Sequence, residues 1–320
     1  MASIAEPVSL EKWLRRARAI LTAVQRDLRD AELGQILLCA AMGCFIGVVV
    51  GLLHEGVAWL HVFDFGIPAD HYLSEGVGVS RARLLFVPLL GGLVLGLAAR
   101  AVRAKRLNEI VDPIEANALH GGRMSLRDSL WLTFTSVISN GAGASLAMEA
   151  GYSQLGAGLY SWLGRWFRLR RADLRVFVTA GAGAAIAAAF NAPLAGAFYG
   201  YELILGSYTT KALAPVVVAS VCAALTQRAM SHMKALFDVT GNFNVTSANY
   251  FLFAVLGVGA AAVAVAAMQA VTWTERSLRA SGLPDWLRPA LGGALLSALA
   301  LIAPQVLGSG HGAVQFHFDT

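Results

Sequence analysis

The sequence predicts an all-α polytopic membrane protein. Three observations support this prediction: the composition, the glycine content and the distribution of charge. Of 320 residues, 57% are hydrophobic and 14% charged, whereas about 25% of the residues in a soluble domain are charged. The 33 glycines favour closely packed helices in lipid. The net charge of +5 gathers in a few loops, where it reports membrane topology. We therefore expect a lipid bilayer partner and no nucleic acid.

The chain begins with a charged segment that we expect to lie on the membrane surface. Between Glu11 and Arg29, charged residues alternate with apolar residues at roughly helical spacing, and the segment lacks the pattern of a signal peptide. Residues 1–32 are therefore expected to form an amphipathic helix in the cytoplasm.

Charge-free stretches mark the expected membrane spans, because a bilayer core needs about 20 apolar residues in a helix. These stretches are Gln35–Leu53, Leu84–Ala99, Ser129–Met148, Ala150–Gly164, Val176–Tyr201, Ala212–Gln227, Val239–Thr274 and Pro289–Gly310. The loop Trp59–Ser80 holds acids but no Lys or Arg, whereas the segments on both sides of it are basic. The positive-inside rule therefore places the N-terminus in the cytoplasm.

One span carries a break. Val176–Tyr201 is interrupted at Asn191 and Pro193, and a proline pushes the preceding residue out of helical geometry. Such interruptions predict discontinuous helices whose free ends line a polar site near the membrane midplane. An ordinary proline kink explains the pattern equally well.

Two acids lie in otherwise apolar stretches, which makes them candidate functional residues. A carboxylate at membrane depth costs about 2.5–3.5 kcal/mol on insertion scales. Glu149 follows a glycine-rich stretch and precedes a helical run, so we expect it at a helix N-terminus, where backbone N–H groups attract anions. It would then compete with a mobile anion as a gate, or merely cap the helix or pair with an arginine. Glu202 is expected to be buried and hydrogen-bonded.

Enzyme and metal chemistry find little support. The sequence His54-Glu55 begins like a zinc-protease motif but lacks the second histidine. Ser145, with the distant His120 or His311, lacks the glycine of a nucleophile elbow. No paired spacing is found among the three cysteines, which are Cys39, Cys44 and Cys222. We expect no disulfide, no metal site, no cofactor and no enzymatic activity.

Two segments resemble the chloride channel and transporter (CLC) family. Residues Glu149–Gly156, EAGYSQLG, are similar to its gating segment, and Ala187–Glu202, AAAFNAPLAGAFYGYE, is similar to its FNAPLAG stretch. The resemblance implies an inverted-repeat fold with discontinuous helices in a homodimer, with one pathway per subunit for chloride or another small anion, and for protons in exchangers. We expect a first repeat in residues 33–232 and the start of a second in 233–320. A bacterial inner membrane is the expected location.

Residue by residue, the resemblance makes Glu149 the gating carboxylate. The expected anion-binding residues are Met148, Ala150, Gly151, Asp112, Pro113 and Asn117. The structural or proton-path candidates are Glu202, Asn191 and Pro193.

The chain also departs from the family pattern. Its EIVDP segment, Glu109–Pro113, stands where the family has a serine-containing loop, so anion selectivity is expected to differ. Leu203 replaces a second acid beside Glu202, which favours a passive pathway over obligatory proton coupling. The elements that would complete the second repeat are missing, so the repeat is expected to be incomplete. A fluoride or other anion–proton antiporter and a transport-inactive subunit remain alternatives.

Overall fold

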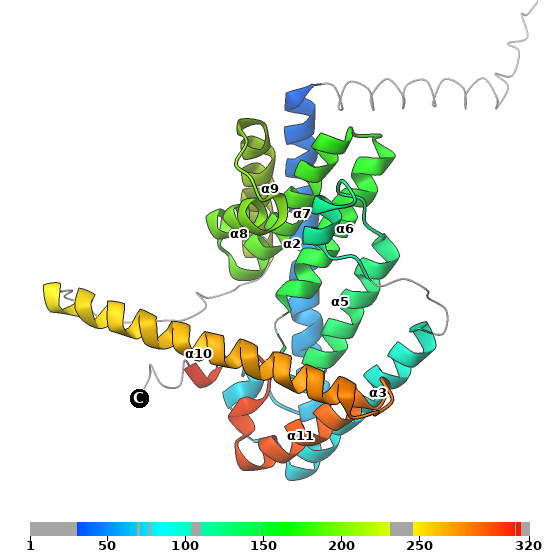
Figure 1. Ribbon diagram of the computed structural model, residues 1–320, viewed down its shortest axis with the longest axis vertical. Coiled ribbons are helices and arrows are strands. Elements are labelled where there is room, and N and C mark those ends of the chain that lie inside the picture. Colours follow the sequence, from blue (N-terminus) through cyan, green and yellow to red (C-terminus); the bar gives the residue numbers. More distant parts are fainter. Residues whose placement is uncertain are drawn as a thin grey trace, which may run out of the picture. The chain divides into compact units, whose positions relative to one another are not determined.

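The computed structural model of the chain is helical throughout the described residues (Figure 1). It describes residues 31–68, 71–75, 78–103, 110–146, 148–230, 246–310 and 312–314. Within these described ranges, five helices are long and apolar enough to cross a membrane, namely α2, α3, α7, α9 and α10. The amphipathic helix expected in residues 1–32 lies almost wholly outside the described residues.

Except for the short α4, the helices overlap the expected spans, but their bounds differ. Several include charged turns that charge-free runs leave out, whereas α5 and α11 end before their expected spans do. The helices are α2 (Glu32–Phe65), α3 (Arg81–Arg103), α4 (Pro113–Ala118), α5 (Leu126–Gly141), α6 (Glu149–Trp166), α7 (Arg171–Phe190), α8 (Pro193–Tyr199), α9 (Thr210–Met230), α10 (Ser247–Ala280) and α11 (Arg288–Ile302). Three short elements complete the order: η1 (Leu73–Glu75), the π-helical η2 (Gly200–Leu205) and η3 (Pro304–Val306). Helix α2 continues to Phe65, so the loop expected from Trp59 begins later.

The chain divides into two compact units. Unit 1 comprises residues 1–59, 108–137 and 147–233, and unit 2 comprises residues 60–107, 138–146 and 234–320. The proposed repeat boundary at residues 232 and 233 stays a prediction.

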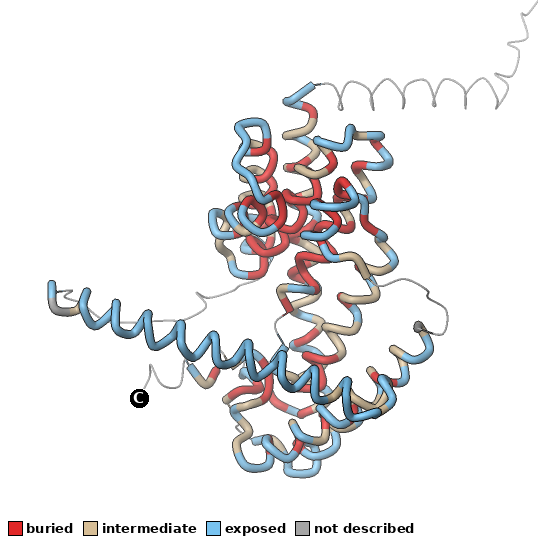
Figure 2. The backbone as a smooth tube through the Cα atoms, viewed as in Figure 1, coloured by how far each residue is buried: buried red, intermediate tan, exposed pale blue. Residues whose placement is uncertain are grey.

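The core of unit 1 surrounds α7, whose central residues are buried along most of the helix (Figure 2). Tyr160 of α6 is fully buried, packs edge-on against Phe177 of α7, and donates a hydrogen bond from its hydroxyl to the Cys39 carbonyl of α2 at 2.8 Å. A methyl group added at Gly183 of α7 would lie 2.7 Å from the Gly196 carbonyl oxygen of α8. Small residues therefore let the backbones of unit 1 approach closely.

The predicted break between α7 and α8 is confirmed. Asn191 ends α7 in the left-handed conformation, with φ 52° and ψ 36°, which asparagine tolerates better than most residues. The Ala192 N–H donates to the Ala187 carbonyl at 3.0 Å, and Pro193 begins α8, where its missing N–H costs no helical bond. The chain therefore forms two separate helices here, and the alternative of a single kinked helix is wrong.

Unit 2 packs α3 against α11 through glycines. A Cβ at Gly92 would meet the Pro289 carbonyl, and one at Gly96 would meet the Trp286 carbonyl. The Arg100 guanidinium lies over the Trp286 ring at 5.6 Å. These contacts fix the turn before α11 against α3.

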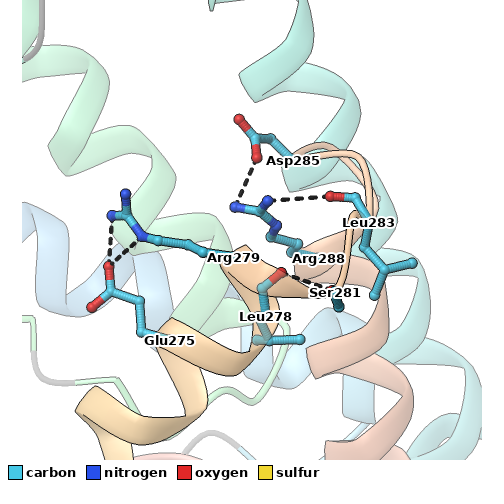
Figure 3. A network of polar contacts seen from close by, with 7 residues as sticks. All are labelled: Glu275, Leu278, Arg279, Ser281, Leu283, Asp285 and Arg288. Carbon is cyan, nitrogen blue, oxygen red and sulfur yellow. Dashed lines mark hydrogen bonds and ion pairs between the residues drawn. The ribbon is translucent and has the colours of Figure 1, made fainter.

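One ion pair lies in the last part of α10 and a second at the start of α11 (Figure 3). Arg279 pairs with Glu275 at 2.7 Å, and Arg288 pairs with Asp285 at 2.7 Å. The Arg288 guanidinium also donates to the Leu283 carbonyl at 3.2 Å. Helix α10 itself is exposed along almost its whole length (Figure 2).

Candidate functional site

The candidate site is the N-terminal end of α6, where the sequence placed Glu149. Glu149 is the first residue of this 18-residue helix, as expected. Met148 occupies the N-cap position with φ −75° and ψ −5°, and its side chain makes no capping hydrogen bond. The first helical bond runs from the Tyr152 N–H to the Met148 carbonyl at 2.9 Å. The N–H groups of Glu149, Ala150 and Gly151 therefore lie at a helix end without helical acceptors.

The Glu149 carboxylate is only partly satisfied. The side chain is half-buried, and its Oε2 atom is buried with no hydrogen-bond partner in the described part of the chain. Neither a capping bond nor an arginine partner for Glu149 is found among the described residues. A buried polar atom without a partner is rare in folded proteins and calls for a functional or structural explanation.

Helix α5 holds the start of α6 in place. The Thr133 hydroxyl donates to the Gly151 carbonyl at 3.0 Å, and a Cβ added at Gly151 would lie 3.2 Å from the Ser136 Cβ. Gly151 therefore provides a close approach that keeps the helix end rigid. A fixed helix end keeps its N–H groups oriented for an anion.

Tyr152 and His54 complete the surroundings of Glu149. Tyr152 lies three residues after Glu149 and therefore on the same face of α6; its hydroxyl donates to the Met148 sulfur at 3.5 Å. The His54 ring of α2 packs edge-on against Tyr152 with centroids 5.2 Å apart. From the sequence, His54 was a candidate only as part of a zinc motif. Helical spacing from Glu149 was the signal that could have identified Tyr152.

Asp112 and Asn117, at and in α4, both make hydrogen bonds within the protein. Asp112 is the N-cap of α4 and accepts a hydrogen bond from the Glu115 N–H at 2.7 Å, and Pro113 is the first helical residue. Asn117 is 1% exposed, and its Nδ2 donates to the Arg175 carbonyl at 3.2 Å, the Thr179 hydroxyl at 3.0 Å and the Ile204 carbonyl at 3.1 Å. Asn117 thus ties α4 to α7 and η2.

The expected burial of Glu202 is wrong. Glu202 is exposed in η2, and its carboxylate accepts a hydrogen bond from the Tyr208 hydroxyl at 2.8 Å. This hydrogen bond raises the pKa of the Tyr208 hydroxyl above its usual value. The π-helical turn that carries Glu202 changes the direction of successive side chains relative to an α-helix. The apolar residues next to Glu202 in the sequence therefore did not indicate whether its side chain is buried.

Two residues weighed for an enzyme mechanism have other surroundings. His120 lies 3.6 Å from the Glu115 carboxylate at the end of α4, and Ser145 is exposed in the segment before α6. His311 lies outside the described residues.

Broken helices, long apolar helices and a carboxylate at a helix end define an integral membrane protein. A family model described as "Voltage gated chloride channel" matches residues 89–320. The chain belongs to this voltage-gated chloride channel (CLC) family, whose members are ion channels or transporters rather than enzymes.

Curated relatives carry chloride channel names. A putative ClcB-like chloride channel protein of Ralstonia nicotianae is 32% identical over 238 residues, covering 73% of this chain and 55% of that protein. The voltage-gated ClC-type chloride channel ClcB of Salmonella typhimurium is 27% identical over 286 residues, covering 88% of this chain and 68% of that protein. The chain therefore spans about half the length of the Ralstonia relative.

Solved structures share the fold. A slow cyanobacterial Cl⁻/H⁺ antiporter aligns with a TM-score of 0.68 at 22% identity, covering 89% of this chain and 68% of that one. A CLC-type fluoride/proton antiporter aligns with a TM-score of 0.68 at 21% identity, covering 89% of this chain and 70% of that one. These similarities confirm the all-α CLC fold predicted from the sequence.

Proposed function

We propose that the chain moves chloride or another small anion across the membrane and that Glu149 gates the pathway. The observation that carries this proposal is the buried, unpartnered Oε2 of Glu149 at the uncapped end of α6. A carboxylate and a permeating anion have the same charge and prefer the same N–H donors. One therefore displaces the other, and the side chain blocks the pathway when it holds the donors.

Protonation controls this competition. A neutral carboxyl group has little attraction to the positive end of a helix dipole, so protonating Glu149 releases the donors to the anion. The backbone at Met148, Ala150 and Gly151 forms the proposed binding surface. Asp112, Pro113 and Asn117 lie in or beside α4 and are assigned a secondary place in the pathway, because the Asp112 and Asn117 side chains are already hydrogen-bonded.

The side chains near η2 favour a passive pathway for this chain. Leu203 stands beside Glu202, and Glu202 is exposed and bonded to Tyr208. Glu202, with Asn191 and Pro193 at the helix break, is therefore proposed as a structural residue, with a proton path as the alternative. The choice between chloride and fluoride is left to measurement, since the solved antiporters of both ions match with the same TM-score.

The assembly and location follow from the family. We propose a homodimer in a bacterial inner membrane with the N-terminus in the cytoplasm. The exposed apolar side chains of α8 and of the following segment include Leu194, Phe198 and Tyr208. Such side chains suit contact with lipid or with a second subunit.

The test is anion flux from proteoliposomes at several pH values, comparing the wild-type chain with Glu149→Gln. A permanently neutral side chain is expected to raise chloride flux and to remove its pH dependence. Glu202→Gln is the matched control, because it makes the same chemical change at an exposed carboxylate and should leave the pH profile intact. Flux is compared for chloride, nitrate and fluoride.

Two outcomes would decide against the proposal. An unchanged flux and pH profile in Glu149→Gln would remove Glu149 from the mechanism. A folded wild-type chain with no flux of any of the three anions would instead favour the alternative of a transport-inactive subunit. The Ralstonia relative is longer than this chain, which is consistent with that alternative.

A further inference from the structure

The turn between α6 and α7 is strongly basic. Residues 165–175, RWFRLRRADLR, contain five arginines and one acid, Asp173. We call residues 165–175 the basic turn. It belongs to unit 1, as do the helices on both sides of it.

The arginines of the basic turn differ in what they contact. Arg165 supports the fold, since its guanidinium donates to the Met124 carbonyl at 2.9 Å. Arg168 and Arg171 are exposed, and neither has an ion pair with any residue that the structure describes. In unit 2, by contrast, Arg279 pairs with the acid four residues before it, and Arg288 pairs with the acid three residues before it (Figure 3). Arg168 and Arg171 therefore present positive charge that no acid among the described residues compensates.

Arg168 also has an unfavourable backbone conformation. Its φ is 55°, in the left-handed region, at the position after a helix where glycine is usual. The turn is closed by the Leu169 N–H, which donates to the Gly164 carbonyl at 2.9 Å. A side chain in this conformation is strained and glycine would not be, so the local backbone gives no reason for an arginine.

The residues around the basic turn are those found at a membrane–water interface. Trp162 and Trp166 lie four residues apart on α6 and are 48% and 47% exposed, and exposed tryptophans are enriched at the headgroup level of membranes. The side chain of Arg171 covers Gly121 in the loop between α4 and α5. That loop borders a hollow of about 380 Å³, lined by Val111, His120, Arg123, Ser125 and Asp128.

We propose that the basic turn binds the phosphate group of an anionic phospholipid, with Arg168 and Arg171 as its main ligands. The arginine guanidinium matches phosphate with two parallel hydrogen bonds. Trp162 and Trp166 hold this end of α6 at the depth of the headgroups, so the phosphate of a lipid lies within reach. Arg123 lines the hollow and adds positive charge near Gly121 in the sequence, and an acid, Asp128, also lines it.

The test is native mass spectrometry of the purified chain titrated with phosphatidylglycerol and, separately, with phosphatidylcholine. A basic residue near an anionic lipid contributes roughly a five-fold increase in binding, so Arg168→Gln with Arg171→Gln is expected to weaken phosphatidylglycerol binding by about 30-fold. Arg276→Gln with Arg279→Gln is the control, because it removes the same charge from the exposed α10. This control should change binding by less than about two-fold.

A second variant separates lipid binding from backbone strain. Arg168→Gly should weaken phosphatidylglycerol binding by about five-fold while raising the melting temperature. A purely structural Arg168 would raise the melting temperature without changing lipid binding, and that result would overturn the proposal. Equal losses in the two double variants would also overturn it, as would full displacement of the lipid by millimolar inorganic phosphate.

Discussion

Replacing Asn117 by leucine would test whether this residue holds helices together or faces the ion. The side chain is 1% exposed, and leucine has the same number of side-chain heavy atoms in the same branched arrangement. The Nδ2 group has two hydrogens for three acceptors at 3.0–3.2 Å, so it serves about two of them at once. The Thr179 hydroxyl still donates to the Arg175 carbonyl at 2.8 Å. The acceptors left without a donor in Asn117→Leu are therefore Thr179 Oγ1 and the Ile204 carbonyl.

The expected cost follows from this count. A buried acceptor without a partner costs about 1–3 kcal/mol. The substitution also removes the Asn117 Oδ1 atom, which is buried without a partner in the described residues. Removing this atom offsets part of the cost of the two unpaired acceptors. We expect the free energy of unfolding to fall by about 1–3 kcal/mol, a large share of the 5–15 kcal/mol typical of a domain.

The measurement is denaturant unfolding in detergent micelles, paired with anion flux from proteoliposomes. Thr179→Val and the double variant complete a mutant cycle, and a coupling of about 0.5–3 kcal/mol is expected for residues in direct contact. A stable Asn117→Leu protein with altered ion preference would refute the reasoning and place Asn117 at the ion. Additive effects in the cycle would show that the bond to Thr179 contributes nothing.

Further predictions concern unit 2 and η2. Gly96→Val should lower the free energy of unfolding by about 2–3 kcal/mol, because the added atoms meet the Trp286 carbonyl, a backbone group that cannot rotate away; an unchanged melting temperature would contradict the α3–α11 packing. Glu202→Gln should lower the pKa of Tyr208, since the hydrogen bond to the carboxylate is the main cause of its raised pKa. That bond stabilises the fold below the usual tyrosine pKa and is lost as the pH rises through the raised one, so an ultraviolet titration of phenolate absorbance should show one tyrosine shifted down.

The helical fold could be predicted almost completely from the distribution of charge. A helix overlaps each expected span, and the break at Asn191, which divides one span, was visible because proline has a narrow backbone preference and asparagine tolerates the left-handed conformation. The true ends were not visible. Helix α2 continues through Asp64, because a charge near a helix end costs little once it reaches water.

The candidate site was only partly predictable. Glu149 could be placed at a helix end because glycines precede it and a helical run follows it. Its missing partner could not, because hydrogen bonding depends on neighbours distant in the sequence. The same limit applies to Asn117, whose three acceptors lie 58, 62 and 87 residues further along the chain, and to Glu202, which a π-helical turn exposes.

The length of α2 has a consequence for how the helix lies in a bilayer. Its 34 residues correspond to a rod of about 51 Å at 1.5 Å per residue, against a hydrocarbon thickness of about 30 Å. Even at a tilt of 40°, the upper end of the usual range, the helix would extend roughly 9 Å further along the membrane normal than the hydrocarbon layer is thick. The charge-free part of α2 ends at Leu53, and Glu55 and Asp64 follow it, so the protruding end is the C-terminal one.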